Sequence, residues 1–315
     1  MNDNYSDGIQ KLYNCVSKGL GMLMMPKDVR EIIDKEAKQI EMIDVDGGMV
    51  GEIVETYPGE QPIETVKALY GRTCSRLLYQ EMRKQENIEM VVDKAKALLV
   101  SEESVNGEEV DEDWVSRFFN SVQDVSNEDM QRLWGRILAG EVKRPNSFSL
   151  RCLDTLSKMT RQEAMLFESL RPYIINYRGT WAIIRDEKLN EKYKIHYEKI
   201  LSMAECGLMD SSAMMTLNLK VQNQYPLQIV YDEELLKTSN EEERKIGLPI
   251  YKLTQTGIEL FHILDEKYNK DYFQDVARWL AKRNGDVEFL MHKIISKNSD
   301  GSFQYLVSGT KIEKD

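Results

Sequence analysis

Apolar residues recur at spacings of three and four along most of the chain, as they do in helices that pack one face against a core. Residues 8–26 form the first such segment, which ends at Pro26, and residues 27–44 form a second, mostly charged one. Residues 62–99 contain no proline and only one glycine, so the pattern predicts a single long helix. Its polar middle, RKQENIE, argues against a continuous coiled coil, but a rod of this length usually packs on a partner helix or another subunit.

Residues 113–158 predict an antiparallel helical hairpin. The second helix lies within SNEDMQRLWGRILAGEVKRP, residues 126–145. Ser126 is expected to cap its start, with Asp129 at the positive end of the helix, and Pro145 ends it. The first helix starts near Asp113, and the short connection QDVS brings the two together.

Four residues of this hairpin are structural or interaction candidates: Gln131, Trp134, Glu141 and Arg151. We expect Trp134 to anchor the core and Gly140 to let a neighbour approach. A buried Glu141 needs a partner, and Arg151 or Arg136 could supply it. We therefore interpret Glu141 as part of a structural lock and not as a catalytic acid.

The second half of the chain changes from helices to alternating strands. Thr160 and Glu163 have the spacing of a capping box that opens a helix. YRGTWAIIR then predicts a strand, residues 192–206 a helix that ends at Gly207, and PLQIVYDEE and PIYKLTQTG two further strands. Helix, strand, helix, helix and a two-stranded wing is the winged-helix order, and the LTQTG turn at 253–257 is similar to one found in such domains.

The predicted fold class is mainly α (α+β): N-terminal helices with one long helix, a helical hairpin, and a winged-helix-like domain with a small antiparallel sheet. Residues 266–315 add the helix DYFQDVARWLAKR, a short helix from Val287 to Ile295 and an edge strand at 302–309. The predicted divisions are an N-terminal helical region, the long helix, an acidic linker, the hairpin, the winged-helix-like domain and the C-terminal elements, at residues 1–61, 62–100, 101–112, 113–158, 159–265 and 266–315.

Charge and composition narrow the set of possible functions. Hydrophobic residues make up 42% of the chain and charged residues 30%, as in ordinary globular proteins, and the net charge is −11. Such a charge repels nucleic-acid phosphates at long range. Lys192, Lys194 and Lys199 are possible nucleic-acid contacts, but the presumed wing carries Glu241–Glu243, so DNA binding is possible and not favoured.

The sequence offers no recognisable catalytic or metal chemistry. Its four cysteines, Cys15, Cys74, Cys152 and Cys206, are too widely spaced for a zinc or redox motif, and nucleotide-binding and nucleophile motifs are absent. We predict no enzyme, no cofactor and no metal. No apolar run approaches the ~20 residues that cross a bilayer, so we expect a cytoplasmic location. Residues 8–26 could still lie on a membrane surface, although their polar face has few cations.

The run from Asp113 to Glu168, with its Q-x-x-W-x-x-I-L-A-G-E motif at 131–141, resembles an uncharacterised bacterial family known only as a domain of unknown function. The likeness covers roughly residues 8–260. The same core also resembles the alpha-type abortive-infection proteins of bacteria. That resemblance implies a role in defence against phages and supplies no catalytic residues to transfer.

Three functions follow as expectations. The first is a non-enzymatic defence protein that acts through protein partners and forms a homo-oligomer through the long helix. The second is a winged-helix DNA-binding regulator. The third is an effector that perturbs membranes through residues 8–26.

Overall fold

The computed structural model describes residues 6–20, 63–100, 102, 105–210, 215–298 and 302–313. For residues 63–67 it describes the backbone alone. The chain divides into two compact units, residues 1–153 and 154–315. The predicted segment 27–44 lies outside the described residues.

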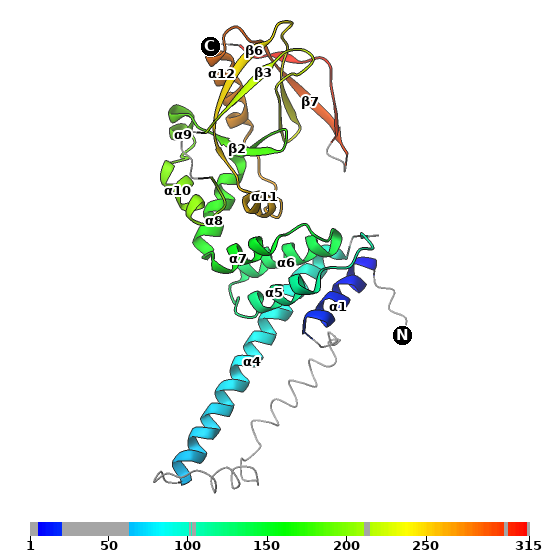
Figure 1. The fold of residues 1–315 in the computed structure, drawn as a ribbon, viewed down its shortest axis with the longest axis vertical. Helices are drawn as coiled ribbons and strands as arrows, with labels where there is room; N and C mark the ends of the chain where they lie inside the picture. Colours follow the sequence, from blue (N-terminus) through cyan, green and yellow to red (C-terminus); the bar gives the residue numbers. More distant parts are fainter. Residues whose placement is uncertain are drawn as a thin grey trace. The chain divides into compact units, whose positions relative to one another are not determined.

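The long helix is confirmed as α4 (Ile63–Leu99), which at 1.5 Å per residue is about 55 Å long. Its two halves have different surroundings. From Asn87 onward it packs against the rest of the first unit and buries Val91, Val92 and Ala95 completely. Its N-terminal half extends beyond this packed region (Figure 1).

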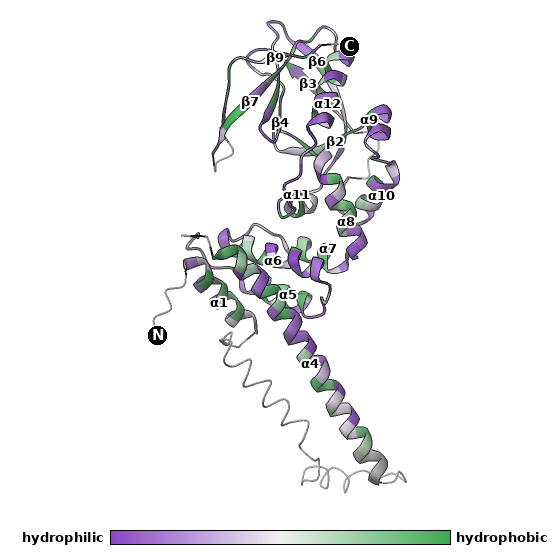
Figure 2. Cartoon of the chain, turned by 180° about the vertical axis from the view of Figure 1, so that it is seen from behind, coloured by the Kyte–Doolittle hydropathy of each residue, from purple (hydrophilic) through white to green (hydrophobic). Residues whose placement is uncertain are grey.

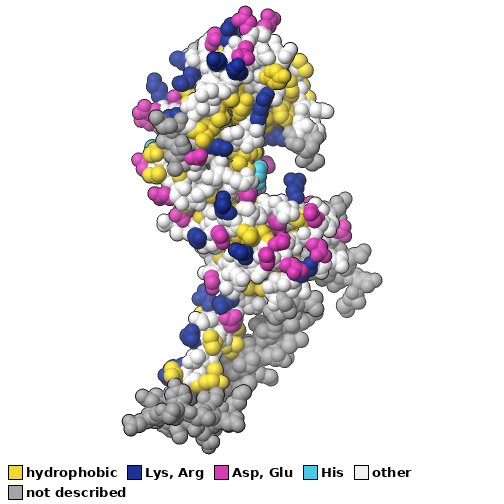
Figure 3. All heavy atoms as spheres, viewed as in Figure 1, with side chains coloured by type: hydrophobic (Ala, Val, Ile, Leu, Met, Phe, Trp, Pro, Cys, Tyr) yellow, Lys and Arg dark blue, Asp and Glu magenta, His cyan; other side chains and the backbone are white. Residues whose placement is uncertain are grey.

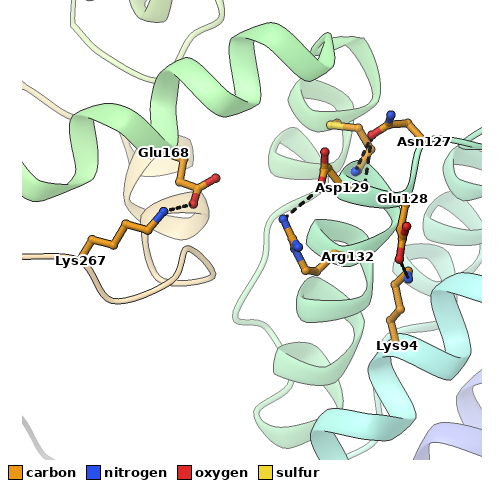
Figure 4. A network of polar contacts seen from close by, with 8 residues as sticks. Lys94, Asn127, Glu128, Asp129, Arg132, Glu168 and Lys267 are labelled. Carbon is orange, nitrogen blue, oxygen red and sulfur yellow. Dashed lines mark hydrogen bonds and ion pairs between the residues drawn. The ribbon is translucent and has the colours of Figure 1, made fainter.

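Among its described residues, the first unit contains four other helices: α1 (Asp7–Leu20), α5 (Glu112–Val122), α6 (Glu128–Lys143) and the start of α7 (Leu150–Lys158). The hairpin prediction is confirmed by α5 and α6. The predicted cap is wrong by one residue, because Asn127, and not Ser126, accepts hydrogen bonds from the N–H groups of Asp129 and Met130 (Figure 4). Glu128 of the same turn forms an ion pair with Lys94 of α4 at 3.6 Å.

The core of the first unit is centred on Trp134, whose side chain is fully buried. Its indole meets the ring of Phe118 edge to face at a centroid distance of 5.4 Å. The next residue, Gly135, allows α6 to lie close to α4, because a Cβ there would come within 2.8 Å of the Cβ of Lys94 and 3.2 Å of the carbonyl oxygen of Val91. Gly140 similarly leaves room for the ring of Phe148, as expected.

The second unit combines helices with a sheet. The helices are α8 (Arg161–Leu170), α9 (Glu187–Lys192), α10 (Tyr197–Glu205), α11 (Gln255–Phe261) and α12 (Lys270–Arg283), with a 3-10 turn at Arg171–Tyr173. The capping box of Thr160 and Glu163 is confirmed at the start of α8. Gly207 follows α10 with a φ of 75°, the left-handed conformation expected at the end of a helix.

The strands are β1 (Ile175–Tyr177), β2 (Thr180–Ile184), β3 (Thr216–Val221), β4 (Gln228–Tyr231), β5 (Glu234–Thr238), β6 (Arg244–Lys252), β7 (Phe289–Lys297), β8 (Phe303–Tyr305) and β9 (Thr310–Lys311). Within the described residues they form one nine-stranded sheet in the order β3-β6-β2-β1-β4-β5-β7-β8, with β9 also on β7. The described pairings are antiparallel.

This sheet contradicts the predicted fold class, since a winged helix with a small sheet does not contain it. The fold is α+β. Two predicted single strands are hairpins: Arg178 and Gly179 turn the chain between β1 and β2 with φ angles of 46° and 81°, and Asp232 turns it between β4 and β5 with a φ of 51°. Positive φ at both central residues, as at Arg178 and Gly179, is the geometry of a type I′ hairpin turn.

The predicted helix from Val287 to Ile295 is also wrong, because these residues mostly belong to β7, which pairs with β5 over five residues. Apolar residues in this short run match helical spacing as well as strand alternation, and the neighbouring strands decide. The predicted edge strand is confirmed in part by β8.

Helix α12, confirmed as predicted, packs beside the sheet (Figure 1). Phe273 stacks on Tyr231 of β4 at 4.7 Å, and the hydroxyl of the fully buried Tyr272 accepts a hydrogen bond from the backbone N–H of Ile184 in β2 at 3.4 Å. Trp279 donates to Asp186, which also caps α9. These contacts hold the second unit together around α12.

We predict that Trp134→Ala lowers the free energy of unfolding by about 3–5 kcal/mol, the usual cost of truncating a large core aromatic. Leu98→Ala is the matched control, because Leu98 is exposed and should change the stability by less than about 0.5 kcal/mol. Chemical denaturation monitored by circular dichroism measures both. Equal effects of the two substitutions would contradict the central role of Trp134.

Candidate functional site

The N-terminal half of α4 exposes large apolar side chains on several sides of the helix. Their exposed fractions range from 40% to 63%, and they are Leu69, Tyr70, Leu77, Leu78, Tyr79 and Met82. Together with the exposed Cys74 we call this set the α4 surface. Hydrophobic residues are visible along this half in Figure 2 and as yellow atoms in Figure 3. Contiguous exposed apolar side chains of this kind mark interaction sites more often than scattered ones do.

The buried face of α6 contains three of the predicted candidates, at spacings of three and seven: Gln131, Trp134 and Glu141. The side chain of Gln131 donates to the carbonyl oxygen of Val125 at 2.9 Å, which fixes the connection between α5 and α6. The fourth candidate, Arg151, lies on α7 with its side chain exposed. The structure therefore brings three candidates onto one face and places the fourth at the surface.

Glu141 forms a lock with backbone groups. Its carboxylate accepts hydrogen bonds from the N–H groups of Asn146, Ser147 and Phe148 at 2.6, 3.0 and 3.0 Å. The chain can turn back toward the carboxylate because Asn146 adopts a φ of 67°. Phe148 in turn accepts from the indole N–H of Trp114 at 2.8 Å. The loop between α6 and α7 is thus tied to the helical core.

The surroundings of this lock affect a nearby thiol. Burial, with a smaller contribution from the negative charge of Glu141, raises the pKa of Cys15 to about 12 against the opposing effect of Lys11 and Lys18. Cys15 and Cys152 are buried and Cys206 is half-buried, whereas Cys74 is exposed on the α4 surface. Cys74 is therefore the thiol most accessible to reagents.

The three candidate lysines do not form a common basic face on one helix. Lys192 ends α9, Lys194 lies in the connection with a φ of 56°, and Lys199 lies in α10, because the predicted helix 192–206 is interrupted. Lys192 forms an ion pair with Asp275 of α12. Lys199 donates to the carbonyl oxygen of Lys194 at 2.9 Å. Two of these ammonium groups are thus engaged within the second unit.

Asp275 is the centre of a polar contact between α9 and α12. It accepts from Lys192 and from the hydroxyl of Tyr193, and it forms an ion pair with Arg278 at 3.2 Å. Burial by itself would raise the pKa of Asp275, but these hydrogen bonds and the nearby positive charges outweigh burial and lower it. The same contact and burial raise the pKa of Tyr193, with burial as the larger cause. We interpret this cluster as a structural clamp.

Helix α1 turns its apolar residues inward. Ile9, Leu12, Cys15 and Val16 are buried, and α1 packs against α5, α6 and α4. In residues 7–20, the apolar face that would contact a membrane is therefore buried against other helices of the first unit. Residues 21–26 of the predicted membrane segment lie outside the described residues.

None of the described helices has the length and apolar content of a bilayer-crossing segment. In the same part of the chain, no three His, Cys, Asp or Glu side chains are grouped closely enough to hold a metal ion.

The sequence pattern predicts the long helix but not the α4 surface. The apolar residues from Leu69 to Leu78 were visible as a helical stripe. A stripe does not tell whether the chain itself covers it, however, because burial depends on residues distant in sequence.

We predict that Glu141→Gln lowers the free energy of unfolding by about 1–3 kcal/mol, because an amide offers one acceptor oxygen where the carboxylate uses two. The matched control is Arg151→Ala, which should be near neutral because Arg151 is exposed. Denaturant titration compares the two variants. An equal loss in both would indicate that an ion pair with Arg151, and not the backbone donors, forms the lock.

We also predict a pH dependence for Asp275→Asn. Because the folded state lowers the pKa of Asp275, it favours the ionised carboxylate. This contribution to stability is complete above the unfolded pKa of about 3.9 and is lost as the pH falls through the lower folded pKa. The difference in melting temperature between wild type and Asp275→Asn should therefore be largest near pH 7 and shrink toward pH 3. The exposed Asp271→Asn is the control, and a pH-independent difference for Asp275→Asn would contradict the clamp.

Comparison with known proteins gives a family and no function. No curated protein and no solved structure matches the chain. The sequence profile of the family described as "Protein of unknown function (DUF2806)" matches residues 71–277, which include most of α4, both helices of the hairpin and most of the second unit. The chain therefore belongs to the DUF2806 family.

Proposed function

We propose that this protein is a non-enzymatic component of bacterial defence against phages, which acts by binding protein partners through the α4 surface. The observation that carries the proposal is the exposure of six large apolar side chains on one half of a helix whose other half is packed. Exposed apolar area of this kind costs solvation free energy in an isolated protein, and binding a partner recovers it.

The resemblance of the core of the run 113–168, starting at Trp134, to the alpha-type abortive-infection proteins supports the choice of defence as the process. The residues of the Q-x-x-W-x-x-I-L-A-G-E motif have structural roles here. Trp134 fills the core, and Glu141 and Gln131 fix the loops at the two ends of α6. We infer that the motif preserves the scaffold from which α4 extends, and that the scaffold in turn presents the α4 surface.

The two other expected functions have less support. A winged-helix regulator is no longer proposed, because the second unit has a different fold. A membrane-surface role for α1 is disfavoured by the burial of its apolar residues in the first unit. Neither alternative makes use of the α4 surface.

The test is phage protection in cells that express the protein. We expect Leu78→Glu to reduce the efficiency of protection at least tenfold, measured as plaque counts, because a charge in a binding surface must be desolvated without a partner. The control is Met90→Glu, a substitution on the same helix at a residue 38% exposed. Equal protection by wild type and Leu78→Glu, or no protection by wild type against a broad phage panel, would contradict the proposal.

A further inference from the structure

We propose that Arg72, Arg76 and Arg83 form a phosphate-binding stripe on α4, and that the ligand of this stripe is single-stranded nucleic acid. This ligand is additional to the protein partner proposed above and does not depend on it. The local charge of α4, the alignment of the three arginines and an exposed aromatic ring beside them support this ligand.

The charge of the free half of α4, residues 68–85, differs in sign from that of the whole chain. This half contains four basic residues and one acidic residue, whereas the chain has a net charge of −11. The acidic residue, Glu81, forms an ion pair with Lys84 at 2.7 Å. Exposed charges further apart than about 8 Å are largely screened at physiological salt, so acidic residues in distant parts of the chain do not cancel this local excess. The three arginines therefore present a positive surface.

The arginines lie on one side of the helix. Arg76 follows Arg72 by four residues and Arg83 follows Arg76 by seven, so their side chains leave the helix axis within about 40° of one another. All three are exposed, and Lys and Arg side chains appear as dark blue atoms along this half in Figure 3. Val92, which is buried in the first unit, lies on roughly the opposite side of the axis. A ligand can therefore reach the stripe while the rest of α4 stays packed.

Other basic residues of α4 have acidic partners. Lys94, for example, pairs with Glu128 at 3.6 Å. Among the described residues, no carboxylate forms an ion pair with an arginine of the stripe, and Arg76 donates only to the neutral side chain of Gln80 at 3.2 Å. Like charges four residues apart, as at Arg72 and Arg76, destabilise a helix. An anionic ligand would remove this repulsion.

Guanidinium groups are well suited to phosphates. Their planar fork of N–H donors can donate two parallel hydrogen bonds to one phosphate group. Along the helix axis, Arg72 and Arg76 are about 6 Å apart, and Arg76 and Arg83 are about 10 Å apart. A single strand can adjust its phosphates to these spacings, because no second strand fixes its backbone.

The ring of Tyr79 favours a single strand over a duplex. Tyr79 is 63% exposed and lies in the sequence between Arg76 and Arg83. The guanidinium carbon of Arg83 lies 6.0 Å from the centroid of this ring. Proteins that bind single strands combine a positive track for the backbone with aromatic rings on which bases stack. In a duplex the base faces already stack on one another, so Tyr79 would have no free base face to contact.

Fluorescence anisotropy of the full-length protein with a labelled oligothymidylate of about 20 nucleotides tests the stripe. Three phosphate contacts predict that affinity falls about 20-fold as salt rises from about 50 to about 200 mM. Changing Arg72→Gln, Arg76→Gln and Arg83→Gln together should remove most of this salt dependence and reduce the affinity at low salt at least tenfold. Glutamine has nearly the helix propensity of arginine, so α4 should stay folded, which circular dichroism checks.

The matched control combines Arg117→Gln, Arg151→Gln and Lys158→Gln, which removes the same number of positive charges from exposed positions outside α4. This control should bind the oligothymidylate as wild type does. Equal losses in the two triple variants would show that affinity follows the net charge of the chain and would overturn the inference. Undetectable binding by wild type at low salt would overturn it as well.

Competition decides the class of the ligand. Unlabelled oligothymidylate should displace the probe at a lower concentration of charge than polyglutamate or a DNA duplex of the same length. Equal or better displacement by polyglutamate would assign the stripe to acidic polypeptides, and better displacement by the duplex would assign it to double-stranded DNA. Either result would overturn the inference. Tyr79→Ala should weaken binding of the oligothymidylate about tenfold, and an unchanged affinity would contradict base stacking on this ring.

Discussion

The close contact between α4 and α6 is the constraint on which the first unit depends. Gly135 brings the two helices together where Val91 and Ala95 of α4 are buried, and Trp134 fills the core beside this contact. The lock at Glu141 and the bond from Gln131 to Val125 then fix the loops on either side of α6. Since α4 is held over only half of its length, the contact also determines which residues remain at the surface. Packing and exposure are two consequences of the same arrangement.

A helix half without tertiary contacts is difficult to keep folded. Isolated helices shorter than about 12–15 residues are marginal in water, and most helical stability in proteins comes from packing of an apolar face. The free half of α4 is polar between its apolar positions and contains Gly71. Its exposed apolar side chains are therefore best explained by a contact that the described residues do not provide.

Local signals in the sequence predicted several features of both units. The long helix, the hairpin, the packing role of Gly140 and the capping box of Thr160 and Glu163 depend on neighbours within a few residues, and the structure confirms them. The α6 cap was displaced by one residue because Ser126 and Asn127 are both good caps. The prediction of the second unit was wrong at the turns between its strands. Arg178 and Asp232 adopt positive φ without the usual asparagine–glycine signal, so two hairpins were read as single strands and the sheet order was lost.

In the candidate site, too, some features could be predicted from the local sequence and others could not. The residues of the motif could be chosen from the sequence, but three partners of Glu141 are backbone groups that a search for charged side chains does not find. The α4 surface required knowledge of where packing stops, at Asn87, which sequence periodicity does not contain.

Hydrogen exchange along α4 tests the central claim most directly. We expect amides from Leu69 to Gln85 to exchange faster than amides from Val91 to Leu99, because only the second set lies in the packed half of α4. Equal protection of the two sets in the protein alone would contradict the claim that the packing of α4 begins at Asn87 and leaves the α4 surface exposed.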